Sequence, residues 1–148
     1  MNEASIWIDK EGRWFFQGEE ITHRKTYLLY NRNLTRDESG RIILRIGQEI
    51  CPVEVEDAPF VVKSLVLSTS EQSGLESVGL ILNDESREQL LPETLRIGAD
   101  HIPYCQVRGG MFEARFSRGA YQLLVPFIQQ DEQEKRFFIS IDGKKHQL

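Results

Sequence analysis

The sequence predicts an α+β fold that is predominantly antiparallel β, built as two β-rich lobes with one short helix each. Short runs rich in β-branched and aromatic residues recur between turn residues, which is typical of antiparallel sheets. In addition, the string R-K-T-Y-L-L at 24–29 is echoed by R-G-A-Y-Q-L at 118–123. We therefore expect the two lobes to be related by an internal hairpin-helix-hairpin repeat.

The echo extends beyond these six residues, at an offset of 94 or 95 positions. It includes a hydroxyl residue placed to cap each helix, an acidic pair after the helix and an apolar run beyond that pair. These matches are Thr22 with Ser117, 37–38 with 131–132, and 42–46 with 137–141. The alternative is that R-x-x-Y-x-L is a common pattern of amphipathic helices. We favour a duplication, because two copies are too few for a stable solenoid.

The first lobe is expected to open with a hairpin and a helix. Apolar and polar residues alternate over 5–9 and 14–17 about a turn at 10–12, which predicts the hairpin. No Pro or Gly interrupts 22–34, and apolar residues recur there at helical spacing, which predicts the helix. The residues that share its inner face are Tyr27, Leu28, Asn31 and Leu34.

Beyond this helix the pattern returns to strands. The D-E-S-G string at 37–40 ends the helical periodicity, and strands are expected at 41–46, 50–55 and 60–67. Pro59 disfavours the helical region for the residue before it, so we expect a corner in the chain there.

A boundary between lobes is predicted in the middle of the chain. Residues 68–74 form the only low-hydrophobicity stretch of any length, midway between the two helix motifs. We therefore expect a linker at 68–77 between an N-terminal lobe, 1–67, and a C-terminal lobe, 78–148. The alternative is a single compact unit, which a chain of this length can also form.

The second lobe is expected to begin with a strand at 78–82. The segment 83–90 is expected to be a capped helical turn or a long loop ending at Pro92. The β pattern then resumes, with Gly109-Gly110 free to adopt the positive φ of a tight turn. Three strands are predicted there, at 94–97, 104–108 and 111–116.

The second helix and a last hairpin complete the prediction. Ser117 should cap the helix, and Pro126 removes a backbone donor, so we expect a kink or an early stop near Val125. Strands at 137–141 and 144–148 should flank Asp142-Gly143, which is a strong signal for a type I′ turn.

Composition indicates a soluble globular protein without affinity for nucleic acid or membranes. Hydrophobic residues make up 40% of the chain, charged ones 28%, and the net charge is −5. The densest basic groups, 135–136 and 144–145, lie beside acidic residues rather than in a basic surface. No apolar run has the ~18 residues of a membrane span, and 1–7 lacks the features of a signal peptide. We expect a cytoplasmic location.

The cysteines and histidines predict no metal site and no cofactor. Cys51 and Cys105 lack metal-finger spacing and are expected to be packing thiols. His23, His101 and His146 do not form a ligand pair on one helix, and we expect each to be solvated or singly hydrogen-bonded. Neither a nucleophile elbow nor a phosphate-binding glycine loop occurs, so we predict no catalytic residue.

One set of strings resembles a known family. The most specific is V-E-D-A-P-F at 55–60, which extends upstream into 53–54. It is accompanied by G-R-W at 12–14, G-x-x-I at 18–21, P-Y-x-x-V-R-G at 103–109 and E-A-R at 113–115. Together they resemble the bacterial family catalogued as domain of unknown function 1285, over nearly the whole chain. The resemblance implies a β-rich two-lobe architecture with a repeated motif and a link to signalling.

Carboxylates before the proline corner form the first part of a candidate site. Glu54 and Glu56 point to one face of a strand, and with Asp57 they could share a proton or approach a hard cation. Three such groups fall short of the six to eight oxygens that calcium prefers, so no metal is predicted. The structural alternative is that Asp57 accepts backbone N–H groups of the turn while Glu56 pairs with Arg108 or Arg115.

Arginines form the second part. Arg115 and Arg118 bracket the start of the second helix, as Arg24 marks the first, and guanidinium groups there could hold an anionic small molecule or an acidic peptide. The alternative is salt bridging between lobes to the carboxylates. The predicted ligand-binding residues are Glu56, Asp57, Arg108, Arg115 and Arg118.

Three functions are compatible with these patterns. The first is a non-enzymatic binding or regulatory module, with a small anionic ligand or a partner segment in a groove between the lobes. The second is a hydrolase that uses the Glu54, Glu56 and Asp57 carboxylates. The third is a purely structural subunit of a larger assembly.

Overall fold

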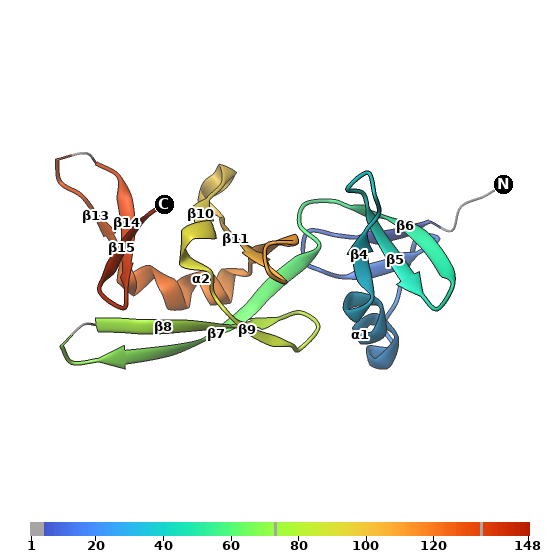
Figure 1. The fold of residues 1–148 in the computed structure, drawn as a ribbon, viewed down its shortest axis with the longest axis horizontal. Helices are drawn as coiled ribbons and strands as arrows, with labels where there is room; N and C mark the ends of the chain where they lie inside the picture. Colours follow the sequence, from blue (N-terminus) through green and yellow to red (C-terminus); the bar gives the residue numbers. More distant parts are fainter. Residues whose placement is uncertain (1–4, 73, 134) are drawn as a thin grey trace. The chain divides into compact units, whose positions relative to one another are not determined.

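The computed structural model describes residues 5–72, 74–133 and 135–148, and it divides the chain into two compact units (Figure 1). The first unit is Met1–Pro59 and the second is Phe60–Leu148. The fold is β-rich, with two six-stranded sheets, a small three-stranded sheet and two short α-helices among the described residues. Within those residues, no helix is long and apolar enough to cross a membrane.

The division falls at Pro59 and Phe60 rather than at 68–77. Most of the expected linker belongs to strands, because β7 (Phe60–Ser70) and β8 (Gly74–Leu82) pair with each other along nearly their whole length. Ser73 lies outside the described residues. The polar serines of this stretch occupy the end of a two-stranded ladder, where half of the side chains face solvent and require no apolar character.

The first unit contains one mixed sheet in the order β3-β2-β1-β6-β5-β4. The strand β6 changes partners along its length, since Val53–Val55 pairs with β1 in parallel and the preceding residues pair with β5 in antiparallel. The strands are β1 (Ile6–Ile8), β2 (Trp14–Phe16), β3 (Glu19–Glu20), β4 (Leu34–Arg36), β5 (Ile42–Ile46) and β6 (Glu49–Val55).

The helix α1 (Arg24–Arg32) buries Leu28 and Asn31, two residues of the predicted inner face. The predicted cap at Thr22 is wrong, because the N-cap residue is His23 and its side chain makes no capping hydrogen bond. Instead, the His23 ring nitrogen Nδ1 lies 2.8 Å from the hydroxyl of Thr26. The helix also ends earlier than predicted, because Leu34 already belongs to β4 and pairs with Leu44.

The second unit is built around the long β7–β8 hairpin, drawn in green in Figure 1. The main sheet has the order β10-β11-β12-β7-β8-β9, so β7 and β12 lie at its centre and pair in parallel. The remaining strands of this sheet are β9 (Arg87–Gln89), β10 (Arg96–Ile97), β11 (Pro103–Val107) and β12 (Phe112–Phe116). Short 3-10 turns, η1 (Pro92–Thr94) and η2 (Ala99–His101), connect β9, β10 and β11.

The segment 83–90 is a turn followed by the strand β9, so the predicted helical turn or long loop is wrong. The physical reason lies in Asp84, whose carboxylate accepts the backbone N–H of Ser86 at 3.0 Å and thereby closes a tight turn. The chain therefore returns at once along β8.

The helix α2 (Arg118–Leu124) packs against β7 and β12 and buries Ala120 and Leu124. Ser117 caps it as predicted, since its hydroxyl accepts the N–H of Ala120 at 3.2 Å. The helix stops where Pro126 requires it to, and a 3-10 turn η3 (Val125–Phe127) follows.

The chain ends in a separate three-stranded sheet, β13 (Ile128–Gln130), β14 (Phe137–Ile141) and β15 (Lys144–Gln147). The predicted turn at Asp142-Gly143 is confirmed, because both residues have positive φ, 53° and 77°, as a type I′ turn demands.

The hairpin-helix-hairpin repeat is confirmed at the level of elements. The helices begin at Arg24 and Arg118, which is the offset of the sequence echo. An antiparallel pair precedes each helix, β1–β2 and β11–β12, and a three-stranded antiparallel run follows, β4-β5-β6 and β13-β14-β15. The copies differ in their parallel contact, because β1 pairs with β6 whereas β12 pairs with β7.

Candidate functional site

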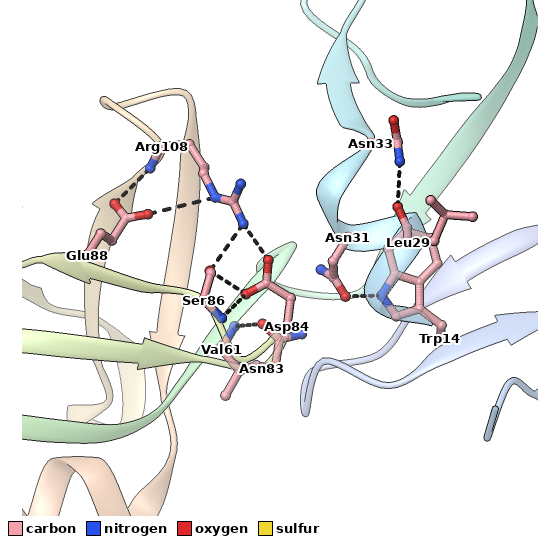
Figure 2. Close-up of polar contacts among 10 residues, drawn as sticks. All are labelled: Trp14, Leu29, Asn31, Asn33, Val61, Asn83, Asp84, Ser86, Glu88 and Arg108. Carbon is pink, nitrogen blue, oxygen red and sulfur yellow. Dashed lines mark hydrogen bonds and ion pairs between the residues drawn. The ribbon is translucent and has the colours of Figure 1, made fainter. Parts of the chain in front are cut away.

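Arg108 is the predicted site residue with the most defined surroundings, and all of its partners below belong to the second unit. It lies in the turn after β11, and its guanidinium forms an ion pair with Asp84 from the β8–β9 turn (Figure 2). A second carboxylate approaches from β9, with Glu88 Oε2 3.7 Å from Arg108 Nε. The backbone N–H of Arg108 also donates to Glu88 Oε1 at 2.9 Å.

The Asp84 side chain is completely buried, which makes its pairing important. A buried carboxylate is costly unless a cation and hydrogen-bond donors compensate for the lost water. Asp84 receives both, from the Arg108 guanidinium and from the Ser86 hydroxyl and backbone N–H. The Arg108 guanidinium carbon also lies 4.9 Å from the centre of the Phe60 ring, a cation–π arrangement.

This network fixes two turns to each other. Arg108 adopts a positive φ of 55°, which is uncommon for a residue with a side chain, and the Glu88 acceptor helps to hold that conformation. Because two carboxylates face one guanidinium, its charge is already balanced. The geometry therefore favours a structural role for Arg108 over the capture of an anionic ligand.

The predicted carboxylates lie in the first unit, at the end of β6. Glu56 accepts the backbone N–H of Lys10 at 3.0 Å, which joins it to the β1–β2 turn. The side chains of Glu54, Glu56 and Asp57 are exposed. Ala58 is buried beneath this corner.

The two remaining arginines lie on either side of the start of α2. Arg115 is half-buried on β12, opposite Tyr104 of β11 and Val61 of β7, and Arg118 is the exposed first residue of the helix. Arg108 precedes β12 and Arg118 follows it, so a five-residue strand, about 17 Å long, separates them. The structure therefore does not bring Arg108 and Arg118 into one site.

The two cysteines differ in burial. Cys105 is fully buried, and burial, with the nearby carboxylates of Glu113 and Glu88, raises the pKa of its thiol to about 12. Cys51 is half-buried, and both cysteines are free thiols. Within the part of the chain that the structure describes, no three His, Cys, Asp or Glu residues are placed to hold a metal ion.

Two recesses adjoin each other on the second unit. The larger, ≈ 420 Å³, lies on the face of β7, β8 and β9 and includes the exposed Val66. The smaller, ≈ 280 Å³, lies beside β8 between η1 and the β14–β15 turn. Ser77 and Gln89 line both recesses.

Sequence reasoning missed Asp84, although a signal for it exists. The string D-E-S occurs at 37–39 and again at 84–86. In both copies the Asp carboxylate accepts the N–H of the Ser two residues on, at 2.9 Å and 3.0 Å. A related string, D-x-x-G-R, occurs at 9–13 and 37–41, and in both cases the Arg pairs with the Asp.

Comparison with known proteins gives two kinds of likeness, and no family model matches the chain. Among curated proteins, the chain is 29% identical over 110 residues to the glycine–tRNA ligase of Pyrococcus furiosus, with 66% of the chain covered. It is 31% identical over 84 residues to that of Pyrococcus horikoshii, with 55% covered. The chain spans only 19% and 15% of these two ligases.

Solved structures show the likeness of fold. A DUF1285 family protein from Silicibacter pomeroyi DSS-3 superposes with a TM-score of 0.80 at 21% identity, covering 99% of this chain and 80% of that one. A second, from Shewanella baltica OS155, has a TM-score of 0.66 at 17% identity, covering 83% of this chain and 91% of that one. The chain thus has the fold of the solved DUF1285 family proteins, as its resemblance to domain of unknown function 1285 implied.

Proposed function

We propose that this protein is a non-enzymatic binding or regulatory module that holds a partner segment on its second unit. The observation that supports the proposal is the pair of adjoining recesses on β7, β8 and β9. Binding sites are concave and combine apolar surface with polar groups, and both recesses are lined by apolar and polar side chains. A role in signal transduction and a cytoplasmic location belong to the same proposal.

The larger recess owes its shape to Gly79. Gly79 lies directly opposite Val66 in the β7–β8 ladder, and the Val66 side chain is 50% exposed. The missing side chain at Gly79 leaves space beside an exposed apolar group, with Ser68 and Ser77 as the next pair on the same face of the hairpin. We infer that this face receives a small apolar side chain of the partner.

A capture experiment with two matched variants tests the proposal. The tagged wild-type chain is used to isolate partners from its native cell, beside Val66→Asp and the control Ile50→Asp. Both positions are exposed, 50% and 55%, so neither change should unfold the protein. The proposal requires a partner that is retained by the wild type and by Ile50→Asp but lost with Val66→Asp. Equal capture by all three forms, or no specific capture, contradicts it.

Binding of the predicted anionic ligand by the arginines can be tested separately. Arg118 is exposed and Arg115 half-buried, whereas Arg108 is held by Asp84 and Glu88. If the arginines bind an anion, Arg118→Ala should abolish the thermal stabilisation that a panel of phosphates and dicarboxylates produces. If no anion raises the melting temperature of the wild type, this part of the proposal is wrong.

The hydrolase alternative has a less suitable geometry. Catalytic carboxylates usually lie in a pocket that encloses the substrate, whereas Glu54, Glu56 and Asp57 are exposed. The alternative predicts esterase, phosphatase or glycosidase activity that disappears in Glu56→Gln and Asp57→Asn. A loss of thermal stability alone would indicate that these carboxylates are structural.

The likeness to glycine–tRNA ligases makes it necessary to ask whether this chain binds RNA. Phosphate contacts require clustered Lys and Arg, and the chain carries a net charge of −5. We therefore propose that the shared segment does not contact tRNA in this protein. Fluorescence anisotropy with a labelled tRNA mixture should show no binding at physiological salt, and salt-sensitive binding would contradict this view.

A further inference from the structure

The smaller recess is formed by three elements of the second unit that are far apart in sequence. Its floor is β8, and its walls are the segment through Leu90 and η1 on one side and the β14–β15 turn on the other. Among the described residues, β9 pairs with Gly79–Ile81 of β8, and no strand pairs with 74–78 on that side. The recess therefore lies beside the part of β8 that β9 does not cover.

Backbone hydrogen bonds fix both walls to this floor. The N–H of Asp142 donates to the Leu75 carbonyl at 2.9 Å, and the N–H of Leu90 donates to the Val78 carbonyl at 2.8 Å. The two bonds meet β8 on either side of Glu76 and Ser77, which both line the recess. A recess held in this way is preorganised, so binding loses little free energy to the ordering of its walls.

The lining combines a buried apolar base with a charged rim. Val78, Leu90 and Ile141 are buried, with 2%, 6% and 5% of their surface exposed. The rim carries exposed carboxylates and one ammonium group, so negative charge is in excess by two. The charged rim residues are Glu76, Glu93, Asp142 and Lys144, and His146 also lines the recess.

We propose that this recess binds a cation carried on an alkyl stem, the chemistry shared by a lysine or arginine side chain and a free alkyl amine or guanidine. The stem would lie against Leu90 and Ile141 while the head remains at the rim near Glu76 and Glu93. Pockets for drug-sized ligands have volumes of roughly 300–1,000 Å³, so a recess of ≈ 280 Å³ suits one side chain better than a cofactor.

This inference rests on the proposed function, since a partner's side chain is one source of the cation. The test is a titration of the 148-residue chain with N-acetyl-arginine methylamide, followed by two-dimensional NMR. The matched probe is N-acetyl-citrulline methylamide, which has the same shape without the charge. The arginine probe should shift the amide signals of Val78, Leu90 and Asp142 in a saturable way, and the citrulline probe should not.

Substitutions of the rim carboxylates test whether these groups bind the arginine probe. Glu93→Gln and Glu76→Gln should each lower the affinity for the arginine probe about two- to fivefold, as expected for the loss of an exposed ion pair. Glu38→Gln, which removes an exposed carboxylate in the first unit, should change nothing. Equal binding of the citrulline probe, no saturable shift with the arginine probe, or equal affinity in all three variants overturns the proposal.

The source of the cation is identified by two further probes. Butylguanidinium carries the stem and the charge alone, whereas the capped tripeptide Ala-Arg-Ala adds the flanking backbone and side chains of a partner segment. Tighter binding of the tripeptide indicates a partner segment, and equal affinity indicates a free small molecule. If the arginine probe fails while Val66→Asp still abolishes partner capture, the recess assignment alone is wrong and the binding module stands.

Discussion

At the scale of single residues, aspartates in turns are the most informative feature of this protein. Asp9, Asp37, Asp84 and Asp131 each follow a strand and each accept a backbone N–H two residues further on, at 2.9 to 3.0 Å. Three of them also pair with an arginine, and Asp131 lies 3.4 Å from Lys145. One carboxylate thus shapes the turn with one oxygen and binds a cation with the other.

The Asp84–Arg108 pair should be the most sensitive of these contacts. Removing the guanidinium in Arg108→Ala leaves a buried carboxylate without its cation, so we expect a loss of about 3–5 kcal/mol in the free energy of unfolding, measured by urea titration. Arg41→Ala is the matched control, because its partner Asp37 is partly exposed, and it should cost under about 1 kcal/mol. Similar losses in the free energy of unfolding of both variants would mean that the burial of Asp84 does not make its ion pair more important than that of Asp37.

Asp9 should contribute stability that depends on pH. Burial opposes ionisation of its carboxyl, but hydrogen bonds from the backbone and guanidinium of Arg13 and from the Glu11 N–H outweigh it and lower the pKa below the ordinary 3.8. The lowered pKa belongs to the folded state, so the stabilisation is present above about pH 4 and is lost as the pH falls through the folded pKa.

Replacing Asp9 by Asn removes this titration. Between pH 6 and pH 2, the melting temperature of Asp9→Asn should fall less than that of the wild type, as followed by circular dichroism. Glu38→Gln, a change at an exposed turn residue, serves as the control. Parallel curves for wild type and Asp9→Asn would show that the carboxyl titrates alike in the folded and unfolded states.

At the scale of elements, sequence predicted the longer strands and missed four of the short ones. Runs of β-branched or aromatic residues between turn residues revealed β5, β7 and β12. The short strands β3, β4, β9 and β13 have two or three residues, too few for a period of two to be recognised from the residues alone. β9 is entirely polar, Arg87-Glu88-Gln89, and exists because the Asp84 turn directs the chain back along β8. Prediction of the candidate site from the sequence was incomplete for a related reason. Arg108 could be singled out, but its partners Glu88 and Asp84 lie 20 and 24 residues away, and only the tertiary structure identifies them.

The short helix α2 offers a stabilising substitution. Gly119 lies in its first turn, its φ is not positive, and an added methyl group would meet no atom within 4 Å. Gly119→Ala should therefore raise the free energy of unfolding by about 0.4–1 kcal/mol, through the smaller entropy of the unfolded chain. Gly143→Ala, which also meets no atom but has a φ of 77°, should destabilise instead. The same sign for both changes, measured by urea titration, would contradict this account.

At the scale of the whole molecule, the position of the boundary has a testable consequence. The second unit begins at Phe60, and β7 occupies the centre of its main sheet, paired with β8 on one side and β12 on the other. Phe60 and Val62 are fully buried, so this strand belongs to the core. A boundary at 68–77 would instead divide a central strand from its partners.

Two fragments of the chain distinguish between these two positions of the boundary. The fragment 60–148 keeps β7 and the complete strand order, and it should melt cooperatively and give dispersed amide signals in two-dimensional NMR. The fragment 78–148 lacks β7 and part of β8, so the pairs Ala114 with Phe60 and Val66 with Gly79 cannot form. It exposes the apolar edge of β12 and should remain unfolded or aggregate. If 78–148 folds on its own, β7 is dispensable, and the recesses that depend on its pairing with β8 lose their structural basis.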